Sequence, residues 1–157
     1  MPVSEEKFRY ALGHFASGVT VVTCKSETGK LLGITVSAFT SLSLDPPLVL
    51  ICIDQRASVH ADLKEGGSFA VNFLAENQEA VSRRFASREP DRFAGVGYRE
   101  GLSGAPLIEG ALAFLECRVV HAYPGGDHTI FVGQVEGADV DEGKPLLYFR
   151  GGYSNIG

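Results

Sequence analysis

Residues 111–140 have the sequence ALAFLECRVVHAYPGGDHTIFVGQVEGADV, which contains two long runs of strand-favouring residues. The runs, 111–123 and 128–140, flank the tight sequence PGGD at 124–127. A turn of this kind between two strand-like runs is typical of an antiparallel hairpin. The stretch therefore predicts that antiparallel β-structure dominates the fold.

Shorter runs on either side of this hairpin predict further strands. Residues 19–24 and 31–39 are rich in β-branched and apolar residues around a turn at Gly29, which predicts a second hairpin. Residues 48–53 are almost wholly apolar, so they are predicted to form a strand buried on both faces. Two more strands are expected, at 68–74 and 146–149.

Short helices and one long loop complete the expected elements. Phe8, Leu12 and Phe15 recur at helical spacing behind Ser4, a suitable N-cap, which predicts an amphipathic helix. Since helices do not alternate regularly with strands, a doubly wound parallel sheet is not expected. The sequence predicts a mostly β fold with short helices, a closed or split antiparallel barrel. The remaining elements are two helices, at 57–63 and 78–86, and a polar, Gly-rich surface loop at 87–105 that is a candidate mobile segment.

Composition limits the size and the partners of the fold. The 157 residues, 45% of them hydrophobic, predict a single domain spanning 1–157. A net charge of -5 argues against nucleic-acid binding, which needs a basic surface. No apolar stretch approaches the roughly 20 residues of a membrane span, and the start does not resemble a signal peptide. We therefore expect a cytoplasmic protein with neither a nucleic-acid nor a membrane partner.

Several kinds of catalytic and metal site are not supported by the sequence. Cys24, Cys52 and Cys117 lie far apart among apolar neighbours, which predicts buried free thiols and no metal site. The fragment Gly95-Val96-Gly97 lacks the third glycine and the following helix of a Rossmann turn. No Walker A, GxSxG or HExxH sequence is present. Neither dinucleotide binding by a Rossmann turn nor hydrolysis by a triad or by zinc is therefore expected.

Hydroxyl residues alternate with apolar ones between Gly33 and Pro47. In a strand, this alternation places Thr35, Ser37 and Ser41 on one side. Small hydroxyl donors on an extended edge suit a flat ring with polar edges and a phosphate. An ordinary solvent-facing strand has the same pattern, so both interpretations stay open at this point.

Four stretches together resemble the short-chain flavin reductase family, which includes reductase components of two-component flavin-dependent monooxygenases. The similarity runs in order along essentially the whole chain. It implies a split β-barrel of the FMN-binding type that acts as a homodimer. The stretches are 15–23, 33–47, 126–133 and 145–153.

The resemblance also implies which residues contact the cofactors. Arg83 and Arg84 are otherwise interpreted as a solvated helix face, and His128 as a core or surface histidine. By resemblance, His128 lies beside the nicotinamide and is the catalytic residue. The flavin-binding residues implied are Thr35, Val36 and Ser37 at the isoalloxazine, Thr40 and Ser41 near the ribityl phosphate, Cys52, Ile53 and Asp54 along the ring, and Ser58, Arg84, Phe85 and Ala86 at the phosphate.

The implied reaction is hydride transfer from NADH or NADPH to a flavin, with FMN the expected flavin and FAD the alternative. Because the cofactors supply the chemistry, no acid-base triad is needed. The reduced flavin would then pass to a partner monooxygenase. Two other functions stay open: a flavin store or redox sensor without turnover, and a β-barrel that binds no cofactor.

Overall fold

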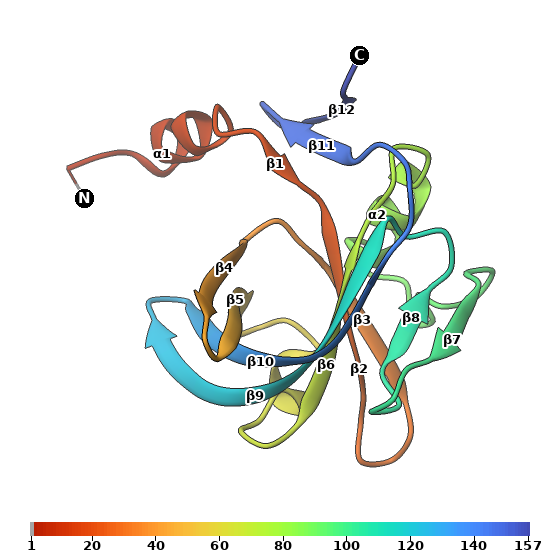
Figure 1. The fold of residues 1–157 in the computed structure, drawn as a ribbon. Helices are drawn as coiled ribbons and strands as arrows, with labels where there is room; N and C mark the ends of the chain where they lie inside the picture. The colour runs from red at the N-terminus through yellow and green to blue at the C-terminus, as the bar shows by residue number, and fades with distance from the viewer. Residues whose placement is uncertain (1) are drawn as a thin grey trace.

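The computed structural model describes residues 2–157, which form a strongly coiled antiparallel sheet with two α-helices (Figure 1). The elements in chain order are α1 (Glu5–Leu12), β1 (Ser17–Gly18), β2 (Thr20–Lys25), β3 (Leu31–Val36), β4 (Phe39–Leu44), β5 (Pro47–Asp54), a 3-10 turn (His60–Asp62), β6 (Ser68–Phe73), α2 (Glu79–Phe85), β7 (Tyr98–Glu100), β8 (Pro106–Ile108), β9 (Ala113–Gly125), β10 (His128–Val140), β11 (Leu146–Phe149) and β12 (Gly152–Asn155).

Seven strands make the main sheet in the order β3-β2-β6-β9-β10-β5-β4, and every neighbouring pair is antiparallel. The predicted hairpin at 111–140 lies at its centre as β9 and β10, which confirms that part of the prediction. The sheet curls into a barrel that is split between its two edge strands, β3 and β4. Two small sheets, β1-β11-β12 and β7-β8, lie outside it.

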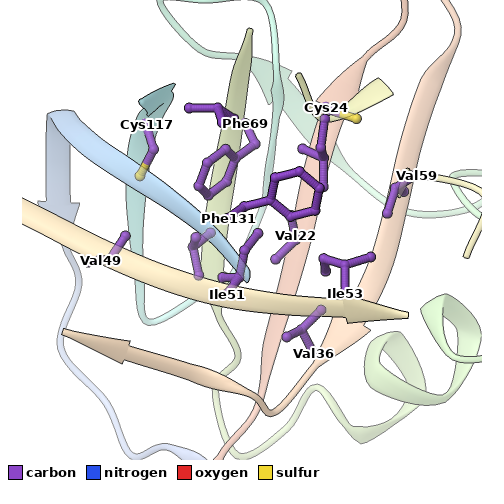
Figure 2. Packing of buried hydrophobic residues seen from close by; sticks show 13 residues of the cluster. Val22, Cys24, Val36, Val49, Ile51, Ile53, Val59, Phe69, Cys117 and Phe131 are labelled. Carbon is purple, nitrogen blue, oxygen red and sulfur yellow. The ribbon is translucent and has the colours of Figure 1, made fainter. Parts of the chain in front are cut away.

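The core fills the inside of this barrel. Figure 2 shows Ile51 and Ile53 of β5 packing towards Phe69 of β6 and Phe131 of β10. These side chains are at most 2% exposed. Cys24 and Cys117 are also buried, and burial raises the pKa of each thiol to about 12. Both are therefore unreactive core thiols, as predicted, whereas Cys52 is only half-buried.

The expected strand 31–39 is two strands. β3 ends at Val36 and β4 begins at Phe39, with Ser37 and Ala38 between them. The Phe39 amide donates to the Ser37 carbonyl at 2.9 Å, which closes a sharp bend. Because β3 and β4 are opposite edges of the sheet, residues 37–38 cross the split of the barrel. Ser37 and Ala38 are both exposed, so the inward-outward alternation of β3 is broken at this bend, which the sequence pattern did not indicate.

Three other expectations need correction. The strand at 48–53 buries only Val49, Ile51 and Ile53, because an antiparallel strand presents one face to the core. Residues 57–63 form turns with a single 3-10 segment, since the amides of His60, Asp62 and Leu63 donate to carbonyls three residues earlier instead of four. The loop 87–105 contains β7, which pairs with β8, and it also buries Phe93.

Helix α1 begins after Ser4, whose Oγ accepts from the Lys7 amide at 3.1 Å, as the sequence predicts. None of its residues is buried. Phe8 and Leu12 are 49% and 57% exposed, so its apolar face does not pack on the barrel of the same chain. In Figure 1 the helix projects beside β1 and away from the barrel. No helix within residues 2–157 is long and apolar enough to cross a membrane.

Candidate active site

Ser37, on the bend between the edge strands, lies where two cavities meet. The first, of about 240 Å³, is mainly apolar and includes Phe39, Phe73 and Leu146. The second, of about 220 Å³, is more polar and includes Thr35 and Tyr153. Both are lined by Val19 and Ser37, so together they form one depression, which we call the Ser37 cleft. An apolar floor with a few polar groups suits a planar heterocycle.

Hydrogen bonds fix the polar wall of the Ser37 cleft. The Thr35 hydroxyl donates to the Ser82 carbonyl of α2 at 2.6 Å. The Ser82 hydroxyl lies 2.8 Å from the Tyr153 hydroxyl, and the Arg83 guanidinium lies 4.8 Å from the Tyr153 ring centre. These contacts join β3, α2 and β12. Sequence reasoning assigned no site role to Tyr153, because only tertiary folding brings β12 to α2.

Some predicted flavin contacts cannot be made by side chains. Val36, Ile53 and Phe85 are 6%, 1% and 0% exposed, since each points into a core cluster. Only the backbone of these residues is available to a ligand. The side chain of Arg84 is also engaged, because its guanidinium donates to the carbonyls of Asp91 and Arg92 at 2.8 Å each. The Arg84 guanidinium therefore holds the loop after α2 through Nε and Nη2, and its contact with the flavin phosphate stays a prediction.

The other predicted flavin-binding residues lie in two parts of the structure: near the bend and the Ser37 cleft, or in a separate cavity. Thr40 and Ser41 are exposed on β4 close to the bend, and Ala86 lines the Ser37 cleft. Ser58 lies elsewhere, in a third cavity of about 250 Å³ that it shares with Gly33 and Arg92. The Ala38 carbonyl accepts from the Cys52 amide at 3.1 Å, so the half-buried Cys52 adjoins the bend. Desolvation raises the pKa of the Cys52 thiol, which keeps it neutral.

His128 lies at the start of β10, opposite Asp54 in the ladder with β5. Its Nδ1 is 2.8 Å from Asp127 Oδ1, which leaves Nε2 as the nitrogen available to a ligand. Asp54 is two residues beyond Cys52, about 7 Å along the strand. The register therefore places the histidine near the bend that carries Ser37, although these residues are 91 positions apart in the sequence.

Arg56 holds the carboxylate of Asp54 with two side-chain hydrogen bonds, at 3.2 and 2.9 Å. These bonds, followed by one from the Arg56 amide, lower the pKa of Asp54 to about 2. The hydrogen bond with His128 likewise lowers the pKa of Asp127. Two ionised carboxylates thus flank the imidazole.

We expect Arg56→Gln to raise the pKa of Asp54 from about 2 towards its ordinary 3.8. The depressed pKa means that the pair is intact above the ordinary value and is lost as the pH falls towards 2. Titration of the Asp54 carboxyl carbon by NMR measures the change. Arg118→Gln, which removes an exposed arginine paired with Glu136, is the control and should leave Asp54 unchanged. An unchanged Asp54 titration in Arg56→Gln would contradict the assignment.

Comparison with known proteins identifies this arrangement. The family model described as "Flavin reductase like domain" matches residues 12–157. The chain belongs to the flavin reductase family. As a member, it is an enzyme that reduces flavin with a nicotinamide nucleotide, and the predictions of family, split-barrel fold and activity are confirmed.

Flavin reductases of several bacteria resemble the chain along most of their lengths. An NADH-dependent flavin reductase from a Rhodococcus species is 47% identical, with 94% of this chain and 84% of the relative covered. The 4-hydroxyphenylacetate 3-monooxygenase reductase component of Thermus thermophilus is 45% identical, with 97% of each covered. A Streptomyces globisporus NADH:FAD oxidoreductase, solved with NAD and FAD fragments, has a TM-score of 0.94 at 41% identity, covering 100% of this chain and 95% of that one.

Proposed function

We propose that the enzyme uses NADH to reduce FMN or FAD bound in the Ser37 cleft and supplies the reduced flavin to a monooxygenase. The observation that carries the site is the continuity from the cleft at Ser37, through the Ala38–Cys52 hydrogen bond, to Asp54 and His128. The relatives named as reductase components of monooxygenases support such a partner. The name of the Rhodococcus relative supports NADH as the donor.

The residues of the cleft suit a flavin by shape and by chemistry. Phe39 and Phe73 supply an apolar wall, and Ser37 adds an exposed hydroxyl where the edge strands leave backbone groups accessible. When bound, the flavin accepts the hydride. The chain has only to hold the flavin and the nicotinamide in contact and to exclude water between them. Because the cofactors supply the chemistry, hydride transfer at this site needs neither a nucleophile nor a general base from the protein.

The exposure of each side chain decides whether we assign its flavin contact to the side chain or to the backbone. Ser37, Thr40 and Ser41 offer side-chain hydroxyls, whereas Val36 and Ile53 offer only backbone atoms. Ser58 and the Ala86 backbone are the proposed contacts on the phosphate side. His128 is the proposed contact for the nicotinamide through Nε2.

Anaerobic mixing of the protein with NADH and FMN tests the proposal. We expect bleaching of the flavin absorbance, and the same with FAD, because the chain belongs to a family of reductases. Heat-denatured protein is the control for uncatalysed reduction. A protein that binds flavin but leaves it oxidised with both NADH and NADPH would instead be a store or sensor.

We also propose that the enzyme is a homodimer in which α1 packs on a second copy. An isolated helix of eight residues is marginal in water, so α1 needs packing that its own chain does not supply. Helix α1 leads directly into Ser17 and Gly18, which line the Ser37 cleft. A second copy on α1 would therefore also cover the cleft. A two-fold interface would bury Phe8, Leu12 and Phe15 of both chains.

Light scattering should give the mass of a dimer at micromolar concentration. Leu12→Glu places a charge on the exposed apolar face of α1, a helix with no buried residue, so it should shift the mass to that of a monomer. Lys7→Glu, on the same helix but at a polar position, is the matched control and should stay dimeric. A monomeric wild-type enzyme would contradict this assembly.

We also propose that the enzyme is located in the cytoplasm. The three cysteines are free thiols, which suits a reducing compartment. The nicotinamide nucleotide on which the reaction depends is a cytoplasmic reductant.

A further inference from the structure

The segment between β5 and β6, residues 55–67, packs one of its turns against the interior of the barrel. Val59 and Leu63 are at most 4% exposed and belong to the same core cluster as Phe131 of β10. Figure 2 shows Val59 beside this interior. His60 lies between them in the chain and begins the 3-10 turn. Because side chains three residues apart eclipse one another in such a turn, the half-buried His60 lies on the same side as Leu63.

The imidazole of His60 makes a specific polar contact with β10. Its Nε2 lies 2.8 Å from the Thr129 hydroxyl, and its ring packs edge-on against Phe131, with 5.6 Å between ring centres. Thr129 and Phe131 are two residues apart on the strand, so they face the same side of it, towards the core. His128, one residue earlier, faces the opposite side. His60 therefore contacts from inside the barrel the strand that presents His128 on the outside.

The backbone on both sides of His128 is held by this same segment. The Gln55 amide donates to the carbonyl of Asp127, immediately before His128, at 3.0 Å. His60 contacts Thr129, immediately after it. The first contact joins two backbone groups and depends on no side chain, whereas the second joins two side chains. A substitution can therefore remove the second contact and leave the first in place.

The start of β10 lies at an exposed end of its hairpin. His128 follows a turn in which Gly126 has a φ of 67°, and residues 121–125 of the paired strand β9 are all exposed. On the other side, the ladder with β5 ends at Asp54, opposite His128. Such a hairpin end, with glycine in its turn, frays unless contacts beyond the hairpin hold it. The contact that His60 makes is one of these.

We propose that His60 is a positioning residue for hydride transfer, which holds Thr129 and thereby fixes the backbone of His128. The inference rests on the proposed role of His128 at the nicotinamide. His60 itself lies on the inner side of the strand and acts only through His128. A shift of about 1 Å in a group that positions the hydride donor readily lowers the rate, so this support has a direct effect on reduction.

Anaerobic single-turnover reduction of FMN by NADH, at saturating flavin, tests the inference. His60→Ala and Thr129→Val should each slow reduction about tenfold, because the His128 backbone loses its support. Thr129→Ser keeps the hydroxyl and should retain the wild-type rate. The FMN dissociation constant should stay unchanged in all three variants. Leu63→Ala, which opens space in the same turn without removing the contact at Thr129, is the matched control and should lower Tm but not the rate.

A double-mutant cycle shows whether His60 acts through His128. In the His128→Ala background no imidazole is left to position, so His60→Ala should cause no further loss of rate. Equal losses in the two backgrounds would make His60 a structural residue and would overturn the inference. Wild-type rates in both His60→Ala and Thr129→Val would overturn it as well.

Backbone NMR separates this inference from the proposed function. The order parameters of the amides at 127–129 should fall in Thr129→Val, because the support of the strand is lost whether or not flavin is reduced. Order parameters that stay unchanged, in an enzyme that reduces FMN normally, would overturn the inference alone. A wild-type enzyme that leaves FMN oxidised would instead contradict the proposed function.

Discussion

Replacing His128 by alanine is expected to slow flavin reduction by NADH at least about 100-fold, because misplacing a hydride donor readily costs that much in rate. The flavin dissociation constant should change little, since His128 is assigned to the nicotinamide and not to the phosphate of the flavin. Anaerobic stopped-flow reduction at saturating flavin measures the rate. Calorimetry or fluorescence titration measures the flavin affinity.

Two further variants separate positioning from general damage to the hairpin. His121→Ala removes an exposed histidine from the neighbouring strand β9 and should reduce flavin at the wild-type rate. Asp127→Asn keeps the side-chain size but removes the charge that holds Nδ1 at 2.8 Å, so a smaller loss of rate is expected. Wild-type reduction and NADH saturation in His128→Ala would make the histidine structural.

The second large effect concerns the core beneath β10. A Cβ at Gly133 would lie 2.6 Å from the Phe69 ring and 3.0 Å from Cys117 Cβ, all within the barrel. Figure 2 shows Phe69 and Cys117 in this packed interior. Gly133→Ala is therefore expected to lower the free energy of unfolding by about 3 kcal/mol, the upper part of the range for overpacking a dense core. Thermal denaturation should show a fall in Tm of about 6–12 °C.

A double-mutant cycle identifies the cause. Phe69→Leu removes the ring atoms that a new Cβ would meet, so Gly133→Ala should cost less in that background than in the wild type. Gly18→Ala, where a Cβ would meet nothing within 4 Å, is the control and should leave Tm almost unchanged. Additive costs of the Phe69 and Gly133 substitutions would contradict the clash.

Local sequence patterns predicted those parts of the fold that depend on neighbouring residues. The hairpins, the N-cap at Ser4 and the strand around Phe69 follow from propensity, alternation and turn chemistry, which act over a few residues. The split at Ser37 did not follow, because β3 pairs with β2 whereas β4 pairs with β5, and such a change of partner strand has no local signature. The helix expected at 57–63 was wrong, because the amides there donate to carbonyls three residues earlier, as in turns and a 3-10 segment.

The sequence by itself determined the architecture and, through its resemblance to known reductases, the chemistry of the protein. Its strand patterns and the segment 33–47 need no long-range information to be recognised. Only the tertiary structure decided which side chains can reach a ligand. It buried Val36, Ile53 and Phe85, tied the Arg84 guanidinium to the loop after α2, and brought Tyr153 to Ser82. The physical reason is that exposure and hydrogen-bond partners depend on which distant strands pair and pack, and these contacts are set by the curled shape of the whole sheet.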